Sequence, residues 1–195
     1  MSVTAAEVHE IQNQADTIKV APGITITELQ RRHVGVVLDL FQAKGTMSKL
    51  RDNFVQDAVY EDLFAKCKNL DEVAGQLLGL PVVTKSSTTL SYLVDSIKPS
   101  SCEDGTGASV PSDEISVDFK HRFEFKLGGK EVTMHSTLLI WSSKEVGKII
   151  RLQDRPLSDI PDYSILTMNA IVAPTLIGIP AGEKEDAEKV MKFQR

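Results

Sequence analysis

Apolar and polar residues alternate through residues 115–127, a pattern with a period of two. This period is typical of a β-strand with one buried and one solvated face. Gly128 and Gly129 follow directly, and such a pair supplies the positive φ angles of a two-residue hairpin turn. The apolar run of residues 132–141 predicts the returning strand. The inner face of the predicted hairpin carries Ile115, Val117, Phe119, His121, Phe123, Phe125 and Leu127.

The predicted turn also fixes which residues of the two strands lie opposite each other, because a slip by one residue would turn every side chain over. With Leu127 opposite Lys130, Phe123 faces Met134 and Phe119 faces Leu138, so that apolar side chains meet on the inner face. In this register His121, the one polar residue among its inner neighbours, faces Ser136.

Residues 148–155 predict a last strand with Leu152 and Asp154 on its inner side. If Leu152 pairs with Leu138, Asp154 lies beside Ser136. His121, Ser136 and Asp154 then form a polar row across three strands that are each about 4.8 Å apart. The sequence therefore predicts that the imidazole approaches the carboxylate directly or through one water.

Helical patterns dominate the N-terminal half of the chain. Thr25 and Glu28 predict a capping box, and apolar residues then recur with a period of 3.6 up to about residue 43. His33 falls within this apolar stripe and is expected to point inward. The remaining patterns predict a short helix or turn at 47–52, a strand at 54–60, a helix at 72–78 capped by Asn69 or Asp71, a long strand at 82–97, and a loop at 99–113.

Composition narrows the class of protein. The 195 residues include 22 Lys and Arg against 27 Asp and Glu, a net charge of -5 that argues against nucleic-acid binding and against attraction to an anionic membrane. Two cysteines make no disulfide framework. The polar start of the chain predicts no secretory signal and the longest apolar stretch is too short to span a bilayer, so we expect a cytoplasmic protein.

These elements predict one α+β domain over residues 24–157, with N-terminal helices packed on a strongly curved antiparallel sheet and a pocket between them. Residues 1–23 are predicted to form a polar N-terminal arm. Residues 158–195 form a C-terminal extension without a strand pattern.

The order of elements resembles the nuclear transport factor 2-like superfamily, a cone-shaped α+β barrel, and within it the SnoaL-like polyketide-cyclase branch. The similarity covers about residues 25–156 and is carried by residues 54–62 (FVQDAVYED), residues 69–73 (NLDEV), the Gly-Gly hairpin and residues 147–150 (GKII). It implies a barrel with a cavity. Members of the superfamily include isomerases, dehydratases, cyclases, transport adaptors and pocketed proteins without known activity, so the resemblance implies no single reaction.

His121 and Asp154 are the candidate catalytic residues, because a buried carboxylate beside an imidazole is suited to proton transfer. The alternative for His121 is a core histidine with satisfied hydrogen bonds. The candidate ligand-binding residues are those expected to face the cavity: His33, Tyr60, Phe119, Phe123, Met134, Ser136, Leu138 and Leu152. We expect no metal and no cofactor, because nothing local fixes a ligand geometry or forms a phosphate-binding loop.

Leu139 and Trp141 alternate to the outer face of the sheet, where an exposed apolar pair would suit a homodimer contact unless the C-terminal segment covers it. Three functions therefore stay open. The chain is a pocketed protein that binds a small apolar or partly aromatic molecule, a cofactor-free isomerase, cyclase or dehydratase, or a dimeric interaction module with an inert cavity.

Overall fold

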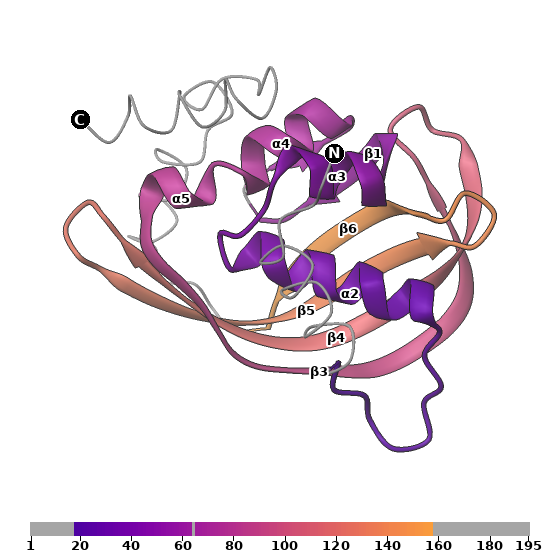
Figure 1. The fold of residues 1–195 in the computed structure, drawn as a ribbon, viewed down its shortest axis with the longest axis horizontal. Coiled ribbons are helices and arrows are strands. Elements are labelled where there is room, and N and C mark those ends of the chain that lie inside the picture. The colour runs from indigo at the N-terminus through magenta and orange to yellow at the C-terminus, as the bar shows by residue number, and fades with distance from the viewer. Residues whose placement is uncertain (1–17, 64, 158–195) are drawn as a thin grey trace, which may run out of the picture.

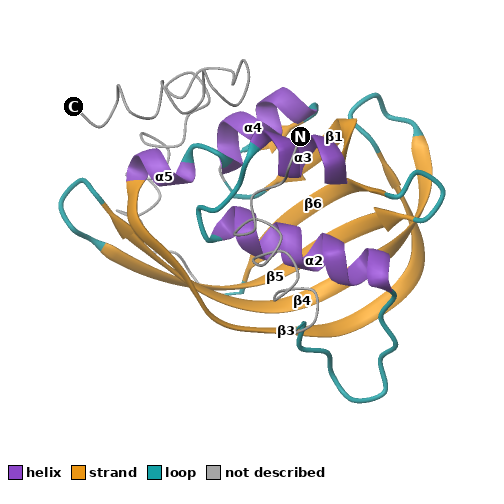
Figure 2. Ribbon diagram, in the orientation of Figure 1, coloured by secondary structure: helices purple, strands orange, loops and turns teal. Residues whose placement is uncertain are grey.

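A computed structural model of the chain describes residues 18–63 and 65–157. The helices are α2 (Glu28–Phe41), α3 (Met47–Asn53), α4 (Leu70–Leu77) and α5 (Leu80–Val83). The strands are β1 (Phe54–Glu61), β2 (Lys66–Cys67), β3 (Thr84–Glu103), β4 (Ser109–Phe125), β5 (Glu131–Ser143) and β6 (Lys148–Pro156). Figure 1 shows the helices gathered on one side of a strongly curved sheet, and Figure 2 shows the same two layers by secondary structure.

The six strands form one sheet in the order β2-β1-β6-β5-β4-β3. Strands β1 and β6 are parallel, whereas the other neighbouring pairs are antiparallel, so the sheet is mixed and open rather than wholly antiparallel and closed. The predicted α+β class, with helices against a curved sheet, is confirmed.

Helix α2 lies across the inner face of the sheet and buries one side almost completely, including Val37 and Leu40 at 0% exposure. Its N-cap is Thr27, whose hydroxyl accepts from the Gln30 amide while the Gln30 side chain accepts from the amide of Thr27. The capping box therefore lies two residues beyond the predicted Thr25 and Glu28. Asn69 caps α4 through the amide of Glu72, one of the two alternatives that the sequence predicted.

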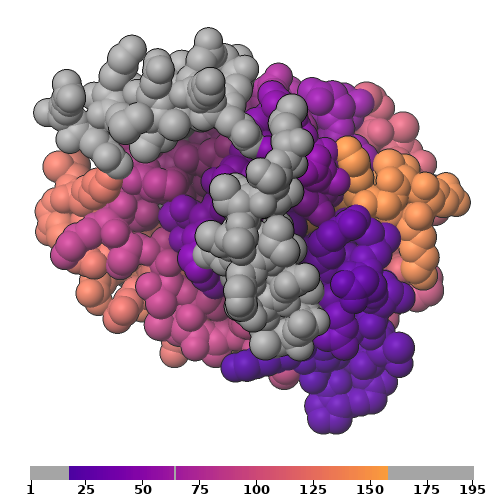
Figure 3. All heavy atoms as spheres, in the orientation of Figure 1, coloured from indigo at the N-terminus to yellow at the C-terminus, as the bar shows by residue number. Residues whose placement is uncertain are grey.

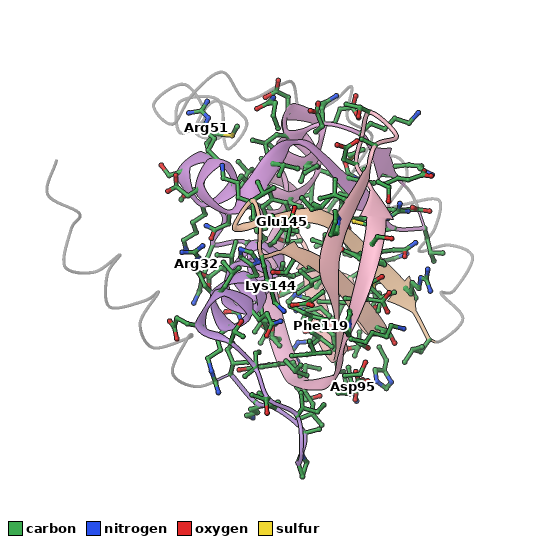
Figure 4. The ribbon with its side chains drawn as sticks, turned by 90° about the vertical axis from the view of Figure 1, so that its right-hand side faces the viewer. Arg32, Arg51, Asp95, Phe119, Lys144 and Glu145 are labelled. Atoms are coloured by element: carbon green, nitrogen blue, oxygen red, sulfur yellow. The ribbon has the colours of Figure 1, made fainter. Side chains whose placement is uncertain are left out.

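The inner face of β4 carries a row of aromatic rings against α2. Phe119 packs edge-on against Phe41 at 5.2 Å between centroids and stacks on His121 at 5.1 Å, and His121 lies 4.5 Å from Phe123. Figure 4 shows Phe119 inside the molecule and Asp95 at its periphery. The predicted inward face of residues 115–125 is thus the centre of the core.

The register of the β4–β5 hairpin differs from the prediction by two residues. Phe119 lies opposite Ser136, and His121 lies opposite Met134. The turn is longer than predicted: the Phe125 N–H donates to the Lys130 carbonyl, which leaves a four-residue loop between the strands. Within this loop Gly128 and Gly129 adopt φ of 76° and 60°. Lys126 leaves the strand pairing: its backbone N–H donates to the Val83 carbonyl.

The β5–β6 register is also displaced by two residues, but in the opposite direction along β5. Leu138 lies opposite Asp154, and Ser136 lies opposite Pro156, so the predicted pairings Leu138 with Leu152 and Ser136 with Asp154 are wrong. A shift of two preserves the faces of the strands, which is why the predicted inner residues of 115–125 are still buried. Leu127, also predicted to face inward, lies in the loop and is 75% exposed.

Strands β3 and β4 extend through most of residues 99–113, where the sequence predicted a loop. Backbone pairing continues to Glu103 opposite Ser109, and only residues 104–108 form the turn. Figure 1 shows this long hairpin curving around the sheet toward β1. There the Gly105 N–H donates to the Asp57 carbonyl at 2.7 Å.

The curved hairpin covers part of the outer face of the sheet. Leu139 and Trp141 are 8% and 7% exposed and pack with Ile150 against Cys102 and Val110 of the hairpin. The predicted exposure of Leu139 and Trp141 is therefore wrong, and the apolar patch expected for a homodimer is covered by the chain itself.

Candidate functional site

A pocket lies between the inner face of the sheet and helices α4 and α5. Its volume is about 40 Å³. The apolar part of its wall comes from the end of α2, from both helices and from β4 and β5, and its polar part from the ends of β1 and β6 and from α4. The described residues that line it are Phe41, Tyr60, Asp62, Leu63, Gln76, Leu77, Leu80, Phe123, Met134, Asp154 and Pro156.

Asp154 is the buried carboxyl group of the pocket, 8% exposed near the end of β6. Its pKa is raised to about 7, chiefly by burial; a hydrogen bond with the Ser136 side chain lowers the pKa and the nearby charge of Asp62 raises it, and both effects are included in that value. Its Oδ1 atom has no hydrogen-bond partner in the described part of the chain. Asp154 therefore titrates near neutral pH, where it can hold or release a proton.

Tyr60 and Asp62 form a hydrogen-bonded pair where β1 ends. The Tyr60 hydroxyl donates to Asp62 Oδ2 at 2.7 Å, and Asp62 Oδ1 accepts from the Ala65 N–H at 2.7 Å, which ties the pair to the turn before β2. Burial, then the charges of Asp62 and Asp154, raise the pKa of Tyr60 well above its ordinary value. Tyr60 is therefore a neutral phenol beside the pocket.

Gln76 of α4 supplies the other buried polar group of the wall. It is 3% exposed, and its Oε1 atom lacks a partner among residues 18–63 and 65–157. A buried acceptor without a partner costs about 1–3 kcal/mol, so both Gln76 and Asp154 gain from a hydrogen-bond donor entering the pocket.

His121 does not line the pocket and does not contact Asp154. It is 1% exposed, and its ring nitrogens contact Ser87 Oγ at 2.8 Å and Thr89 Oγ1 at 3.2 Å on the neighbouring strand β3. Because the Ser87 hydroxyl donates to the Phe41 carbonyl, Ser87 accepts from His121 Nε2–H, and Nδ1 is left to accept from Thr89. Burial lowers the pKa of His121 to about 4, so the ring is neutral. The predicted His121–Asp154 pair is not formed.

His33 lies at the other end of α2, away from the residues that line the pocket. Its Nδ1 is 2.8 Å from Ser142 Oγ. Burial, then the charge of Arg32, lower its pKa to about 4, although the Gly147 carbonyl acts weakly in the opposite direction. Figure 3 shows the surface of α2 beside that of the β5–β6 turn, where Arg32 Nη2 donates to the Gly147 carbonyl at 3.4 Å.

The other predicted ligand-binding residues divide into two groups. Tyr60, Phe123 and Met134 line the pocket together with Asp154. Ser136 is buried and hydrogen-bonds to the Asp154 side chain. Phe119, Leu138 and Leu152 belong to the inner face as predicted, but they are core residues outside the pocket wall.

Phe41 and Gln76 are among the pocket residues that the sequence did not single out. Gln76 follows the buried Val73 by three residues and therefore lies on the buried face of α4, where a polar residue is the available signal. Phe41 follows Val37 by four residues and extends the apolar stripe of α2.

A second, more open groove of about 280 Å³ lies on the outer side, between the β3–β4 hairpin and strands β5 and β6. Its lining is mixed in charge, with Arg151 and Arg155 beside Glu103 and Glu114. The Arg151 guanidinium lies over the Trp141 ring, 5.7 Å from its centroid, and forms an ion pair with Glu61.

Within the described residues, no group of three or more His, Cys, Asp or Glu side chains is placed to hold a metal ion. Among the same residues, no helix has the length and hydrophobicity needed to cross a membrane.

No protein-family model and no curated protein matches the chain. Solved structures do. An NTF2-like protein of unknown function from Exiguobacterium sp. 255-15 is 14% identical, with a TM-score of 0.47 over 65% of this chain and 99% of that one. A SnoaL-like polyketide cyclase, so named putatively, from Jannaschia sp. CCS1 is 15% identical, with a TM-score of 0.44 over 78% and 99%. An NTF2-like superfamily protein from Salmonella enterica serovar Typhimurium LT2 is 9% identical, with a TM-score of 0.46 over 67% and 89%.

These three proteins are named as NTF2-like or SnoaL-like, the superfamily that the sequence resembles. The similarity concerns the fold alone, and the pocket of this chain is described by its own residues.

Proposed function

We propose that this protein binds a small molecule in the pocket between α4, α5 and the sheet. The observation that carries the proposal is the pair of unpartnered oxygens, Asp154 Oδ1 and Gln76 Oε1, on two buried residues of an otherwise largely apolar wall. Ligand sites commonly combine apolar walls with a few polar groups that fix orientation. The ligand is thus an apolar molecule with one polar group that donates a hydrogen bond.

The size of the pocket limits what it encloses. A single water occupies roughly 10–15 Å³ on this measure, and a pocket for a drug-sized ligand has roughly 300–1,000 Å³. A volume of about 40 Å³ therefore encloses a molecule of only a few non-hydrogen atoms, or one end of a larger one.

Methionine methyl groups offer a direct test, because Met134 lines the pocket, whereas Met47 is a buried residue of α3 that does not line it. The protein would be labelled with ¹³C at the methionine methyl groups and titrated with isobutanol, isobutylamine and isobutyrate. We expect at least one probe to shift the Met134 signal, assigned with Met134→Leu, and to leave Met47 unchanged.

Filling the pocket provides the control. Leu80→Trp places a larger side chain in the wall, whereas Leu90→Trp makes the same change at a position that is 45% exposed and not part of the wall. Probe binding should be lost only in Leu80→Trp. If none of the three probes moves the Met134 signal, the binding proposal is wrong.

A second candidate is cofactor-free acid–base catalysis, of the isomerase, cyclase or dehydratase kind, with Asp154 as the proton carrier. The raised pKa of about 7 favours it, because a general base or acid works best when its pKa is near the operating pH. His121 has no part in this version, since its ring is satisfied within the core. Exchange of α-protons of cyclopentanone in D₂O, followed by NMR, tests it: exchange should exceed the protein-free rate and be lost in Asp154→Asn.

A further inference from the structure

We infer that the ligand of this pocket is a small protonated amine whose N–H groups contact Asp154 and whose carbon atoms lie against Phe41, Phe123 and Met134. This inference rests on the proposed binding function and adds the charge of the ligand to it.

The charge of the pocket wall favours a cationic ligand. Asp62 and Asp154 both line the pocket, and no described lysine, arginine or histidine does. The groups that face Asp154 are Ser136 from β5, Tyr60 from the end of β1 and Asp62 directly after that strand. Of these, Ser136 and Tyr60 are neutral and Asp62 is an acid. A cationic ligand therefore supplies the positive partner charge that the described residues around Asp154 do not supply, whereas a carboxylate would be repelled.

The hydrogen-bond acceptors of the wall also favour an ammonium group. Asp154 Oδ1 and Gln76 Oε1 lack partners and accept hydrogen bonds, and a primary ammonium group has three N–H donors. One ligand nitrogen can therefore serve acceptors on β6 and on α4 together. An alcohol has one O–H donor and no charge, so it gains less from the same two oxygens.

The apolar wall also suits a cation. Phe41 and Phe123 line the pocket, and the face of an aromatic ring attracts an ammonium group within about 6 Å of its centroid. The thioether of Met134 is polarisable and adapts to small substituents. These side chains bind the carbon atoms of the amine without competing for its proton.

Amine binding is expected to depend on pH through the carboxyl group. The pKa of Asp154 is raised to about 7 in the free protein, so below pH 7 the group is mostly neutral. The ammonium binds the ionised form, and the amine itself stays protonated up to about pH 10. Because the ionised fraction of a group with a pKa of 7 changes from about 0.9 at pH 8 to about 0.1 at pH 6, the affinity should fall about tenfold over that interval.

The methionine-methyl titration decides the inference when isobutylamine, isobutanol and isobutyrate are compared at pH 6, 7 and 8. We expect isobutylamine to bind about tenfold or more tightly than isobutanol at pH 8, to weaken about tenfold at pH 6, and isobutyrate to leave Met134 unchanged. Asp154→Asn should abolish both the preference for the amine and the pH dependence. Asp95→Asn, the same change at an exposed position, should preserve both.

The outcomes separate the two proposals. If isobutanol binds as tightly as isobutylamine, or if amine binding is the same at pH 6 and pH 8, the ligand is not an ammonium ion, although the pocket still binds small molecules. If no probe shifts Met134, both proposals fail. Should Asp154→Asn not fold, the pH profile of the unmodified protein decides the question by itself.

Discussion

His121 and Asp154 face the same side of the sheet, yet they lie in different rows. His121 is opposite Met134 on β5, and Asp154 is opposite Leu138 on the other edge of the same strand. Four residues of β5 separate the two rows, a distance of roughly 13 Å along the strand in addition to two strand spacings across it. The carboxyl group is therefore part of the pocket wall, whereas the imidazole is part of the core.

The raised pKa of Asp154 makes its contribution to stability depend on pH. The group keeps its proton in the folded protein up to about pH 7 but loses it near pH 3.8 when unfolded, so its contribution is fully present below pH 3.8 and is lost as the pH rises to 7. We expect the free energy of unfolding of the unmodified protein, relative to Asp154→Asn, to fall by roughly 3 kcal/mol between pH 4 and pH 7.

Urea denaturation at half-unit pH intervals measures this difference. Asp95→Asn serves as the control, because that carboxyl group is exposed and should show no such trend. A constant difference between the unmodified protein and Asp154→Asn across the interval would show that the carboxyl group is not desolvated.

His121 should affect stability and acid sensitivity rather than binding. His121→Phe keeps an aromatic ring beside Phe119 and Phe123 but loses the hydrogen bonds to Ser87 and Thr89, which should cost about 1–3 kcal/mol at pH 7.5. Because the folded pKa of His121 is lowered to about 4, the stability that its neutral ring contributes is present above pH 6.5 and lost as the pH falls toward 4.

Between pH 6.5 and pH 4, the free energy of unfolding of His121→Phe should therefore fall by roughly 3 kcal/mol less than that of the unmodified protein. Circular dichroism during urea denaturation gives both quantities, and the Met134 titration should be unchanged. Loss of probe binding in a folded His121→Phe protein would contradict the placement of His121 outside the pocket.

Alternation predicted the faces of the strands correctly, but it could not predict their register. A shift of two residues keeps Phe119, His121 and Phe123 on the inner face, so the hydrophobic pattern is satisfied by either alignment. The register depends on the loop, where the Lys126 N–H donates to the carbonyl of Val83, a residue far away in the sequence. A local hydrophobic pattern cannot predict such a contact.

The same limit applies to the site and to the long hairpin. Asp154, Tyr60 and Gln76 meet only because β6, β1 and α4 are brought together by the fold, and the sequence identified the first two from their positions in predicted strands. Residues 99–113 are rich in Ser, Gly, Pro and acids, which favours a loop, yet a full ladder of backbone pairing holds them as strands. Tertiary pairing outweighs local propensity there.

Trp141 is buried beneath the hairpin, so a charge placed there should unfold the protein rather than disrupt an assembly. Trp141→Arg loses the packing against Cys102 and Val110 and places a cation beside Arg151. We expect a loss of about 3–5 kcal/mol in chemical denaturation followed by circular dichroism. Val146→Arg, at a position 51% exposed, should change stability by less than about 0.5 kcal/mol. A folded, equally stable Trp141→Arg protein of lower mass in light scattering would instead indicate a dimer interface.

Gly105 is the residue that allows the hairpin to close over the sheet. A Cβ atom at this position would lie 1.7 Å from the Lys68 carbonyl oxygen and 3.1 Å from that of Asp57, and neither backbone atom can move as a side chain would. Gly105→Ala should therefore displace the hairpin tip and break the bond from the Gly105 N–H to the Asp57 carbonyl. Overpacking of this kind costs about 1–3 kcal/mol. Trp141 is the single tryptophan of the chain, so its fluorescence emission should move to longer wavelength as water reaches the ring.

Gly75→Ala is the matched control, because its added methyl group meets no atom within 4 Å inside helix α4 and should raise stability by up to about 1 kcal/mol. An unshifted emission spectrum in Gly105→Ala, with unchanged stability, would mean that the hairpin does not depend on this close contact.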